Sequence, residues 1–251
     1  MITGILIIAR LGSTRLPNKH LIKVGDFTFI EWLTKRFEYS FSEQIKKKEV
    51  EIIIATSNKP ENKTFENIYS NKNIKIFFGA DSNIPLRQLE CAEQYNLTNI
   101  ISIDGDDILC STDGALNLLK LLNQGQQSIK TVGLPLGMNS MAYSTLFLKK
   151  CLKKKNFNAK IETGWGRIFQ NKLLEIPISD FPFKKELRFT LDYNEDSFFF
   201  EKIISHFGDQ LINTTDFDII NFVLKNNLFE INSKLSDIYF QNFNNQKKAE
   251  I

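Results

Sequence analysis

Cysteine is scarce in this chain of 251 residues. The three cysteines, Cys91, Cys110 and Cys151, are odd in number and widely spaced, and no CxxC pair occurs. Disulfide-stabilised domains carry even sets of cysteines, and structural zinc sites carry closely spaced ones. The sequence therefore argues against a disulfide framework and against a cysteine zinc site, and we expect a protein of the reducing cytoplasm.

Long apolar runs and a strong excess of one charge are also absent. The N-terminal apolar run, Ile5 to Ala9, is far too short to cross a membrane and lacks the layout of a signal peptide. The 32 basic and 29 acidic residues leave a net charge of +3, which is too even a balance to indicate a nucleic-acid surface. We therefore expect no membrane partner and no nucleic-acid partner.

Short runs of apolar, β-branched residues alternate with segments of helical spacing in the first half of the chain. This alternation is typical of βαβ units, which form a doubly wound, mostly parallel sheet. We predict a single α/β domain over residues 1–240 with a Rossmann-like, three-layer α/β/α architecture, and a polar tail over 241–251 that frays from Asn242 onward. The four strands predicted here are Gly4 to Ala9, Glu51 to Ala55, Ile74 to Phe78 and Asn99 to Ile103.

The second half has a less regular pattern, which predicts a mixture of strands and helices. Glu195 and Asp196 fall at the start of a predicted helix, where negative charge interacts favourably with the helix dipole. The elements expected in this half are helices around Asp113 to Leu122, Asn194 to His206 and Thr215 to Asn226, and strands near Thr131 to Leu134, Leu173 to Ile178 and Leu187 to Leu191.

The segment after the first predicted strand combines small residues with three cations, Arg10, Arg15 and Lys19. Gly12 permits close backbone approach, the serine and threonine that follow it can donate to phosphate oxygens, and the cations offset phosphate charge. Open α/β sheets bind ligands at this carboxyl edge. The Walker and GxGxxG motifs do not match, because their glycines are missing. We predict a triphosphate-binding loop, with a basic surface turn as the alternative. Its predicted nucleotide-binding residues are Ala9, Arg10, Gly12, Ser13, Thr14, Arg15 and Lys19.

Two acidic segments also follow predicted strands. Asp104-Gly105-Asp106-Asp107 comes directly after Ile103, and Asp192 comes directly after Leu191. Clustered carboxylates suit a hard cation, and Mg²⁺ typically takes one or two carboxylates together with substrate phosphates. An acidic turn or a helix cap is the alternative for the first segment. The sequence therefore predicts a cation site at this edge of the sheet.

These segments together resemble one family. The stretch IIARLGSTRLPNKHL, residues 7–21, resembles the opening of the cytidylyltransferases related to spore coat polysaccharide biosynthesis protein F, whose pattern reads approximately IIQARMGSTRLPGKVL. It resembles the CMP-Kdo and CMP-sialic acid synthetases more distantly. The acidic segments resemble the family stretches ITGDCPLID and RLTLDTPEDL. Gly79 to Ala92 matches GS-DDVLxRYxEAA, which aligns Arg87 with the family's arginine.

This resemblance implies an enzyme that uses CTP and Mg²⁺, and its relatives imply a homodimer. Beyond the loop residues, it adds Arg87 and Asp104 to the expected nucleotide-binding residues. The implied metal ligands are Asp106 and Asp192. The residues expected to carry catalysis are Arg10, Lys19, Asp106 and Asp192.

The segment Glu162-Thr163-Gly164-Trp165-Gly166-Arg167 departs from the family, which usually has Glu-His-Val-Thr there. Because only Glu162 matches, the Gly-Trp-Gly-Arg sequence indicates an unusual acceptor. Trp165 and Arg167 are candidates to recognise a planar or anionic group, with a core tryptophan and a surface arginine as the alternative. The predicted acceptor-binding residues are Glu162, Trp165 and Arg167.

The expected reaction is in-line attack of an acceptor oxygen on the α-phosphorus of CTP, with release of pyrophosphate. The leading acceptor is an acidic sugar, such as a 3-deoxy-octulosonate or a nonulosonate, activated for surface polysaccharide biosynthesis. A phosphorylated small molecule that gives a CDP-linked product is the second candidate. Two rival hypotheses are a glycosyltransferase that uses Asp104-Gly105-Asp106 as a DxD motif and a protein that binds nucleotide without turnover.

Overall fold

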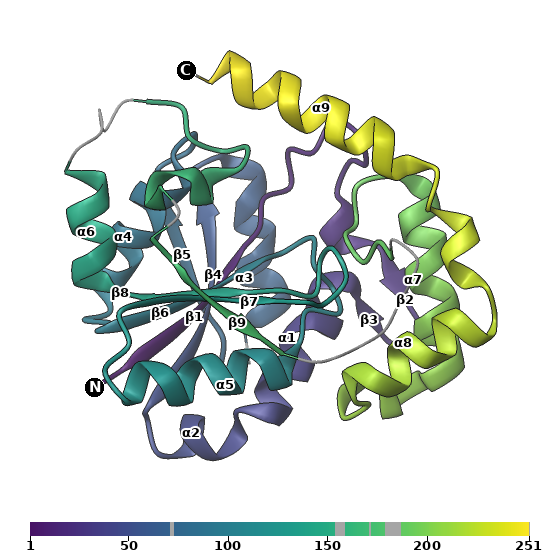
Figure 1. Ribbon diagram of the computed structural model, residues 1–251, viewed down its shortest axis with the longest axis horizontal. Coiled ribbons are helices and arrows are strands. Elements are labelled where there is room, and N and C mark those ends of the chain that lie inside the picture. The colour runs from purple at the N-terminus through teal and green to yellow at the C-terminus, as the bar shows by residue number, and fades with distance from the viewer. Residues whose placement is uncertain (71–72, 154–158, 171, 179–186, 251) are drawn as a thin grey trace.

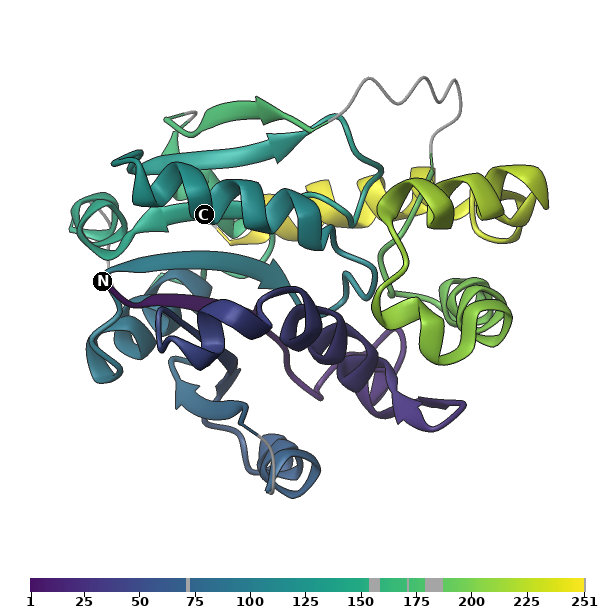
Figure 2. The ribbon, with the colours of Figure 1, turned by 90° about the horizontal axis from the view of Figure 1, so that it is seen from below.

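The fold is built on a sheet of seven strands with helices on both faces (Figures 1 and 2). The computed structural model describes residues 1–70, 73–153, 159–170, 172–178 and 187–250. The strand order is β5-β4-β1-β6-β8-β7-β9, and β8 runs antiparallel to its two neighbours. The strands are β1 (Thr3–Ile8), β4 (Val50–Ser57), β5 (Lys75–Gly79), β6 (Asn99–Asp104), β7 (Ser128–Val132), β8 (Met141–Ser144) and β9 (Leu174–Pro177), and β2 (Lys23–Val24) and β3 (Phe27–Thr28) pair separately.

Different helices cover the two faces of the sheet. α1 (Phe29–Ser40) and α5 (Thr112–Asn123) pack on one face, and α4 (Ile84–Gln94) and α6 (Thr145–Leu152) pack on the other. A further apolar cluster joins the start of α1 to α7 (Asn194–Phe207) and α8 (Asp216–Lys225). The remaining helices are α2 (Ser42–Lys46), α3 (Thr64–Tyr69) and α9 (Leu235–Ala249). The predicted doubly wound, mostly parallel three-layer fold is confirmed.

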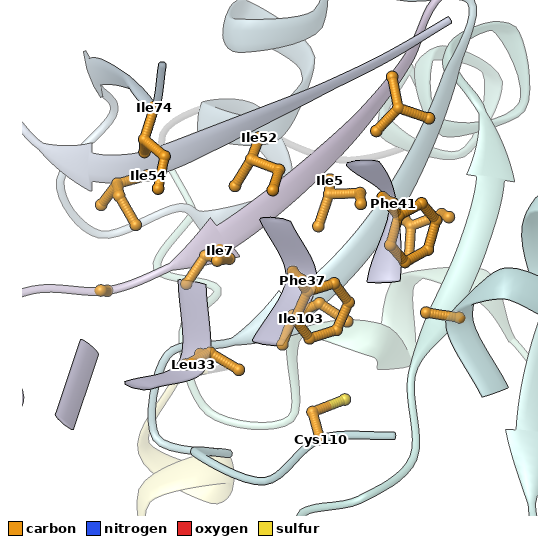
Figure 3. Close-up of a cluster of buried hydrophobic side chains, with 14 of the residues drawn as sticks. Ile5, Ile7, Leu33, Phe37, Phe41, Ile52, Ile54, Ile74, Ile103 and Cys110 are labelled. Atoms are coloured by element: carbon orange, nitrogen blue, oxygen red, sulfur yellow. The ribbon is translucent and has the colours of Figure 1, made fainter. Parts of the chain in front are cut away.

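β1 is apolar along its length because helices cover both of its faces. Successive side chains of a strand point to opposite faces. Ile5 and Ile7 therefore pack in the cluster that contains α1, and Leu6 packs in the cluster that contains α4. Figure 3 shows Leu33 and Phe37 of α1 facing the isoleucines of β1 and β4. A strand buried on both faces requires such a continuous apolar run.

The first four predicted strands are confirmed as β1, β4, β5 and β6, close to their expected bounds. β8 was not predicted, and it is only four residues long. The predicted strand at 187–191 is wrong. Arg188 forms an isolated bridge with Leu136, and the N–H of Leu191 donates to Asp106 O (2.9 Å). The segment is buried, but its backbone bonds two separate loops instead of one neighbouring strand.

The expectation that the chain frays from Asn242 onward is also wrong. α9 continues to Ala249, and the side chain of Glu250 is only 4% exposed. This side chain is held by residues far away in the sequence, so local polarity gave no sign of its order. Among the described residues, no helix is long and apolar enough to cross a membrane.

Phe37→Ala is expected to lower the free energy of unfolding by about 3–5 kcal/mol, because it removes a fully buried ring and leaves a cavity beside β1. Phe198→Ala makes the same change at a ring that is 48% exposed and is expected to cost about 0.5 kcal/mol. Urea denaturation measures both values. Equal losses in the two variants would contradict this account of the core.

Candidate functional site

The loops that follow β1 and β6 meet at the carboxyl edge of the sheet. β1 lies between β4 and β6, so the strand order reverses there, and open α/β sheets bind ligands at such a point. The N–H of Gly105 donates to Ile8 O (2.8 Å). A Cβ atom at Gly105 would lie 2.8 Å from the Cβ of Ala9. Glycine therefore allows the two loops to approach this closely.

A cleft of about 590 Å³ opens beside these loops. Its lining includes every residue that the sequence predicted for nucleotide, metal or acceptor binding: Ala9, Arg10, Gly12, Ser13, Thr14, Arg15, Lys19, Arg87, Asp104, Asp106, Glu162, Trp165, Arg167 and Asp192. The structure thus brings together residues that are up to about 180 positions apart. The roles assigned to them stay predictions.

Lys19 connects the basic loop to both acidic segments. Its ammonium lies 2.6 Å from Asp106 Oδ2 and 3.1 Å from Asp192 Oδ1, and it donates to Leu191 O (2.7 Å). The side chain is only 6% exposed. Burial lowers the pKa of Lys19, but the charges of Asp106 and Asp192 outweigh burial and raise it above its ordinary value. Lys19 is therefore a fixed positive charge at the edge of the cleft.

Asp192 is surrounded by cations. Besides Lys19, its carboxylate contacts Arg15 Nη2 (2.5 Å) and Arg188 Nη2 (3.1 Å), and only 2% of the side chain is exposed. Burial raises the pKa of Asp192, but Lys19, Arg15 and Arg188 together lower it below its usual value. Asp192 is therefore ionised. Asp106 is more open, with 31% of its side chain exposed.

Arg188 and Asp196 form a buried support behind Asp192. Arg188 Nε and Nη2 bond the two Asp196 oxygens at 2.9 and 3.0 Å. Asp196 also accepts the N–H groups of Asp192 and Tyr193, each at 3.0 Å. The helix dipole alone does not account for Asp196, because its side chain is fully buried in this network. The sequence signal for this pair was an arginine within a buried apolar segment, followed by an acid eight positions later.

The carboxylates of Asp106 and Asp192 fit a cation that arrives with a phosphate ligand. Both already converge on one cation, Lys19 Nζ. Within the described part of the chain, no group of three or more His, Cys, Asp or Glu side chains could hold a metal ion by itself. Mg²⁺ needs only one or two carboxylates when substrate phosphates complete its coordination. The residues present therefore suit Mg²⁺ bound jointly by protein and substrate.

Asp104 and Asp107, the other two acids of the segment 104–107, also line the cleft. Burial and the charge of Asp106 raise the pKa of Asp104 to about 6, although Trp165 Nε1 donates to it (3.2 Å). Burial and the neighbouring carboxylates also raise the pKa of Asp107. His20, which the sequence did not single out, lies 3.4 Å from Asp106 Oδ1, and burial lowers its pKa to about 4. The histidine is therefore neutral, and the crowded carboxylates favour a cation in the cleft.

Asn62, which the sequence did not single out, anchors the loop after β1 through side-chain hydrogen bonds. Its Oδ1 accepts the N–H of Leu11 (2.9 Å), and its amide donates to Ser57 O (3.0 Å) and Ser57 Oγ (2.8 Å). Asn62 is buried, whereas Gly12 and Thr14 are exposed on the cleft. The anchored base leaves the tip of the loop open to a ligand.

Arg10 and Arg87 line the same cleft in different ways. Arg10 pairs with Glu162, and its side chain is well exposed. Arg87 is buried and donates to Ala80 O (2.8 Å) and Asp81 O (2.7 Å). Burial lowers the pKa of Arg87 to about 10. Arg87 thus shapes the loop after β5 from within, and its predicted contact with nucleotide remains untested.

Of the predicted acceptor residues, Trp165 contacts Asp104, and all three line the cleft. Trp165 is buried between the cleft and the core, where its ring meets Tyr143 edge-on at 6.5 Å between centroids. Arg167 contacts Glu250 Oε2 (3.0 Å) and the carbonyl of Thr163. Trp165 is therefore both a core residue and a cleft residue, and Arg167 is tied to the end of α9.

Sequence reasoning missed the contribution of α9 altogether. Tyr239, Phe243 and Gln246 line the cleft, although the tail was expected to fray. A weak signal was present in the aromatic residues at 239, 240 and 243, whose spacing places two of them on one helical face.

A family model described as cytidylyltransferase matches residues 4–206. An uncharacterized protein of Methanocaldococcus jannaschii is 28% identical over 226 residues, which cover 88% of this chain and 90% of that protein.

Three solved structures illustrate the similarity of the fold. A cytidylyltransferase from Leptospira borgpetersenii superposes with a TM-score of 0.75 at 23% identity, covering 91% of this chain and 96% of that one. A CMP:2-keto-3-deoxy-manno-octonic acid synthetase complexed with CTP gives 0.59 at 13% identity, covering 82% and 99%. A 4-diphosphocytidyl-2C-methyl-D-erythritol synthase from Anaerococcus prevotii gives 0.55 at 14% identity, covering 81% and 98%. All three share the Rossmann-like architecture.

Asp196→Asn is expected to destabilise the protein by about 3–5 kcal/mol, because it removes the buried charge that pairs with Arg188. Glu195→Gln makes the same chemical change at the preceding, exposed position and is expected to shift stability by about 0.5 kcal/mol or less. Thermal unfolding of the two variants measures the difference. A similar melting temperature for both would show that the Arg188 pair is not a support of the site.

Proposed function

The chain belongs to the cytidylyltransferase family of CTP-dependent nucleotidyltransferases, and we propose that it uses Mg²⁺ to transfer the CMP unit of CTP to a small acidic sugar. The observation that most supports this proposal is the contact of Lys19 with both Asp106 and Asp192 on one cleft. A triphosphate and its accompanying metal ion need both signs of charge in one place. The family match also sets aside the glycosyltransferase hypothesis.

In the proposed reaction, the loop after β1 binds the triphosphate. Its open tip, with Gly12 and Thr14, offers backbone and hydroxyl donors to phosphate oxygens. Lys19 stays protonated and is held in place by Leu191 O, so it requires little reorganisation to stabilise the charge on departing pyrophosphate. Arg15 adds a second positive charge beside it.

Asp106 and Asp192 would hold the metal ion. Magnesium, when bound, would neutralise triphosphate charge and make the α-phosphorus more electrophilic. Asp192 is kept ionised by its cations, and Asp106 faces the cleft. Asp106 is thus open to a hard cation, whereas Asp192 would have to exchange one of its protein cations for the metal ion.

The acidic acceptor is supported by the pairing of two arginines. Arg10 and Arg167 contact Glu162 and Glu250 respectively, and both line the cleft. Arg167 is held by Glu250, whereas Arg10 is well exposed, and an exposed guanidinium suits the acid group of a substrate. One structural neighbour is named for a 2-keto-3-deoxy sugar acid. Another is named for a diphosphocytidyl product, in which cytidine is joined through a diphosphate, so a phosphorylated acceptor is the second candidate. An activated sugar acid would serve surface polysaccharide biosynthesis.

Pyrophosphate release with Mg²⁺ is expected from CTP and an acidic sugar, and not from ATP, GTP or UTP. The assay pairs each nucleotide with sugar acids, sugar phosphates and other small phosphorylated metabolites. Chelation with EDTA is expected to abolish release, because without a metal ion between them the two carboxylates would repel the triphosphate. Release with a phosphorylated acceptor would assign a CDP-linked product, and CTP binding without release from any acceptor would indicate a non-catalytic nucleotide-binding protein.

Lys19→Met is expected to lower kcat/KM for CTP by about 10²–10³-fold, because it removes a preorganised charge next to the departing phosphate. Lys23→Met is the matched control, since Lys23 is an exposed lysine of β2 that does not line the cleft. Thermal unfolding of both variants separates a loss of charge from a loss of folding. A folded Lys19→Met variant with near wild-type turnover would remove Lys19 from the proposed mechanism.

A further inference from the structure

Helix α9 begins beyond residue 206, where the family match ends, yet it forms part of the cleft. In Figure 1 the yellow helix runs from the side of α7 and α8 towards the side of α6. Tyr239, Phe243 and Gln246 line the cleft from this helix. Residues within the family match and α9, which lies beyond it, therefore enclose one space.

The first half of α9 is anchored beside Asp192. The guanidinium carbon of Arg188 lies 4.5 Å from the centre of the Tyr239 ring. The amide of Asn242 donates to Tyr193 Oη (3.1 Å). These contacts attach α9 to the segment that carries one of the proposed metal ligands.

The second half is anchored by Glu250 to the opposite wall. Its carboxylate accepts the backbone N–H of Thr163 (2.9 Å) and of Glu162 (3.1 Å), and it pairs with Arg167 Nη2 (3.0 Å). Burial raises the pKa of Glu250, but the bonds from Thr163, Arg167 and Glu162 outweigh burial and lower it. Glu250 is therefore ionised. We call its bonds to residues 162–167 the Glu250 clasp, because they fasten the end of α9 to this segment.

The glycine of this segment also fits the helix. Gly164 has φ +59°, and a Cβ atom there would lie 2.8 Å from Phe243 Cζ. A larger residue would be strained in its backbone and would push against the ring. The segment Gly-Trp-Gly-Arg, residues 164–167, which departs from the family pattern, therefore packs against α9 and its end through Gly164 and Arg167.

We propose that α9 is the acceptor-side wall of the cleft, that Phe243 and Gln246 select the acceptor, and that Glu250 is the positioning residue that holds this wall. The proposal rests on the proposed function. The phosphates have their cations in the loop after β1, whereas Tyr239, Phe243 and Gln246 carry no charge. An aromatic face and an amide suit the hydroxyl-bearing ring of a sugar rather than a triphosphate.

Hydrogen exchange tests the clasp without any acceptor. In Glu250→Ala, the backbone amides of Glu162 and Thr163 are expected to exchange at least about 10-fold faster than in the wild type, because the carboxylate that accepts their hydrogen bonds is lost. Glu250→Gln keeps an acceptor oxygen and is expected to retain part of the protection. Lys247→Gln, at an exposed position of the same helix, is expected to change nothing. Unchanged exchange in Glu250→Ala would overturn the proposed clasp.

Steady-state kinetics tests whether α9 contributes to binding of the acceptor substrate. With 3-deoxy-manno-octulosonate as the acceptor probe, Phe243→Ala, Gln246→Ala and Glu250→Ala are expected to raise the acceptor KM about 10-fold. The Kd of CTP, titrated without acceptor, is expected to stay within about twofold, and Lys247→Gln is expected to match the wild type. An unchanged acceptor KM would overturn the proposal, and so would an equal rise in the Kd of CTP, which would assign α9 to the nucleotide.

The two proposals fail in different ways. Absence of pyrophosphate release by the wild type with every acceptor would contradict the proposed function. Hydrogen exchange would then still decide whether Glu250 holds α9 over the cleft. Normal release together with unchanged exchange and KM values in the variants would contradict only the role of α9.

Discussion

The ammonium of Lys19 between Asp106 and Asp192 is the interaction on which the site depends. Two carboxylates placed close together at the ends of separate segments would repel each other in a partly buried cleft. Lys19 attracts both carboxylates and reduces their repulsion, and it also bonds Leu191 O, so one side chain joins the loop after β1 to both acidic segments. The same arrangement leaves the positive charge where a triphosphate would lie.

This arrangement requires rigid support, because charged groups at the edge of a sheet would otherwise turn towards bulk water. Asn62 ties the base of the loop to β4, and the buried pair of Arg188 and Asp196 holds the backbone that carries Asp192. A buried ion pair is weak evidence for stability by itself. Here its physical role is positional, since Arg188 also bonds Asp192 directly.

The cleft combines residues within the family match with residues beyond it. The loop after β1 and the acidic segment after β6 lie within the residues matched by the family model, and they carry the charges proposed to bind the nucleotide and its metal ion. α9 lies beyond that match and contributes uncharged side chains. A division of this kind would let one chemistry serve different acceptors, because the wall can change while the phosphate-binding edge is kept.

The sequence by itself determined the parallel half of the sheet and the segments after β1 and β6 that line the cleft. β1, β4 and β6 are buried on both faces and the edge strand β5 is partly buried, so their apolar runs are visible locally, and the motifs after β1 and β6 follow directly from them. Only the tertiary structure decided the pairing of Lys19 with Asp192 and the ordering of the polar tail by Glu250. Both depend on partners more than eighty positions away in the sequence, and a local sequence pattern contains no information about such contacts.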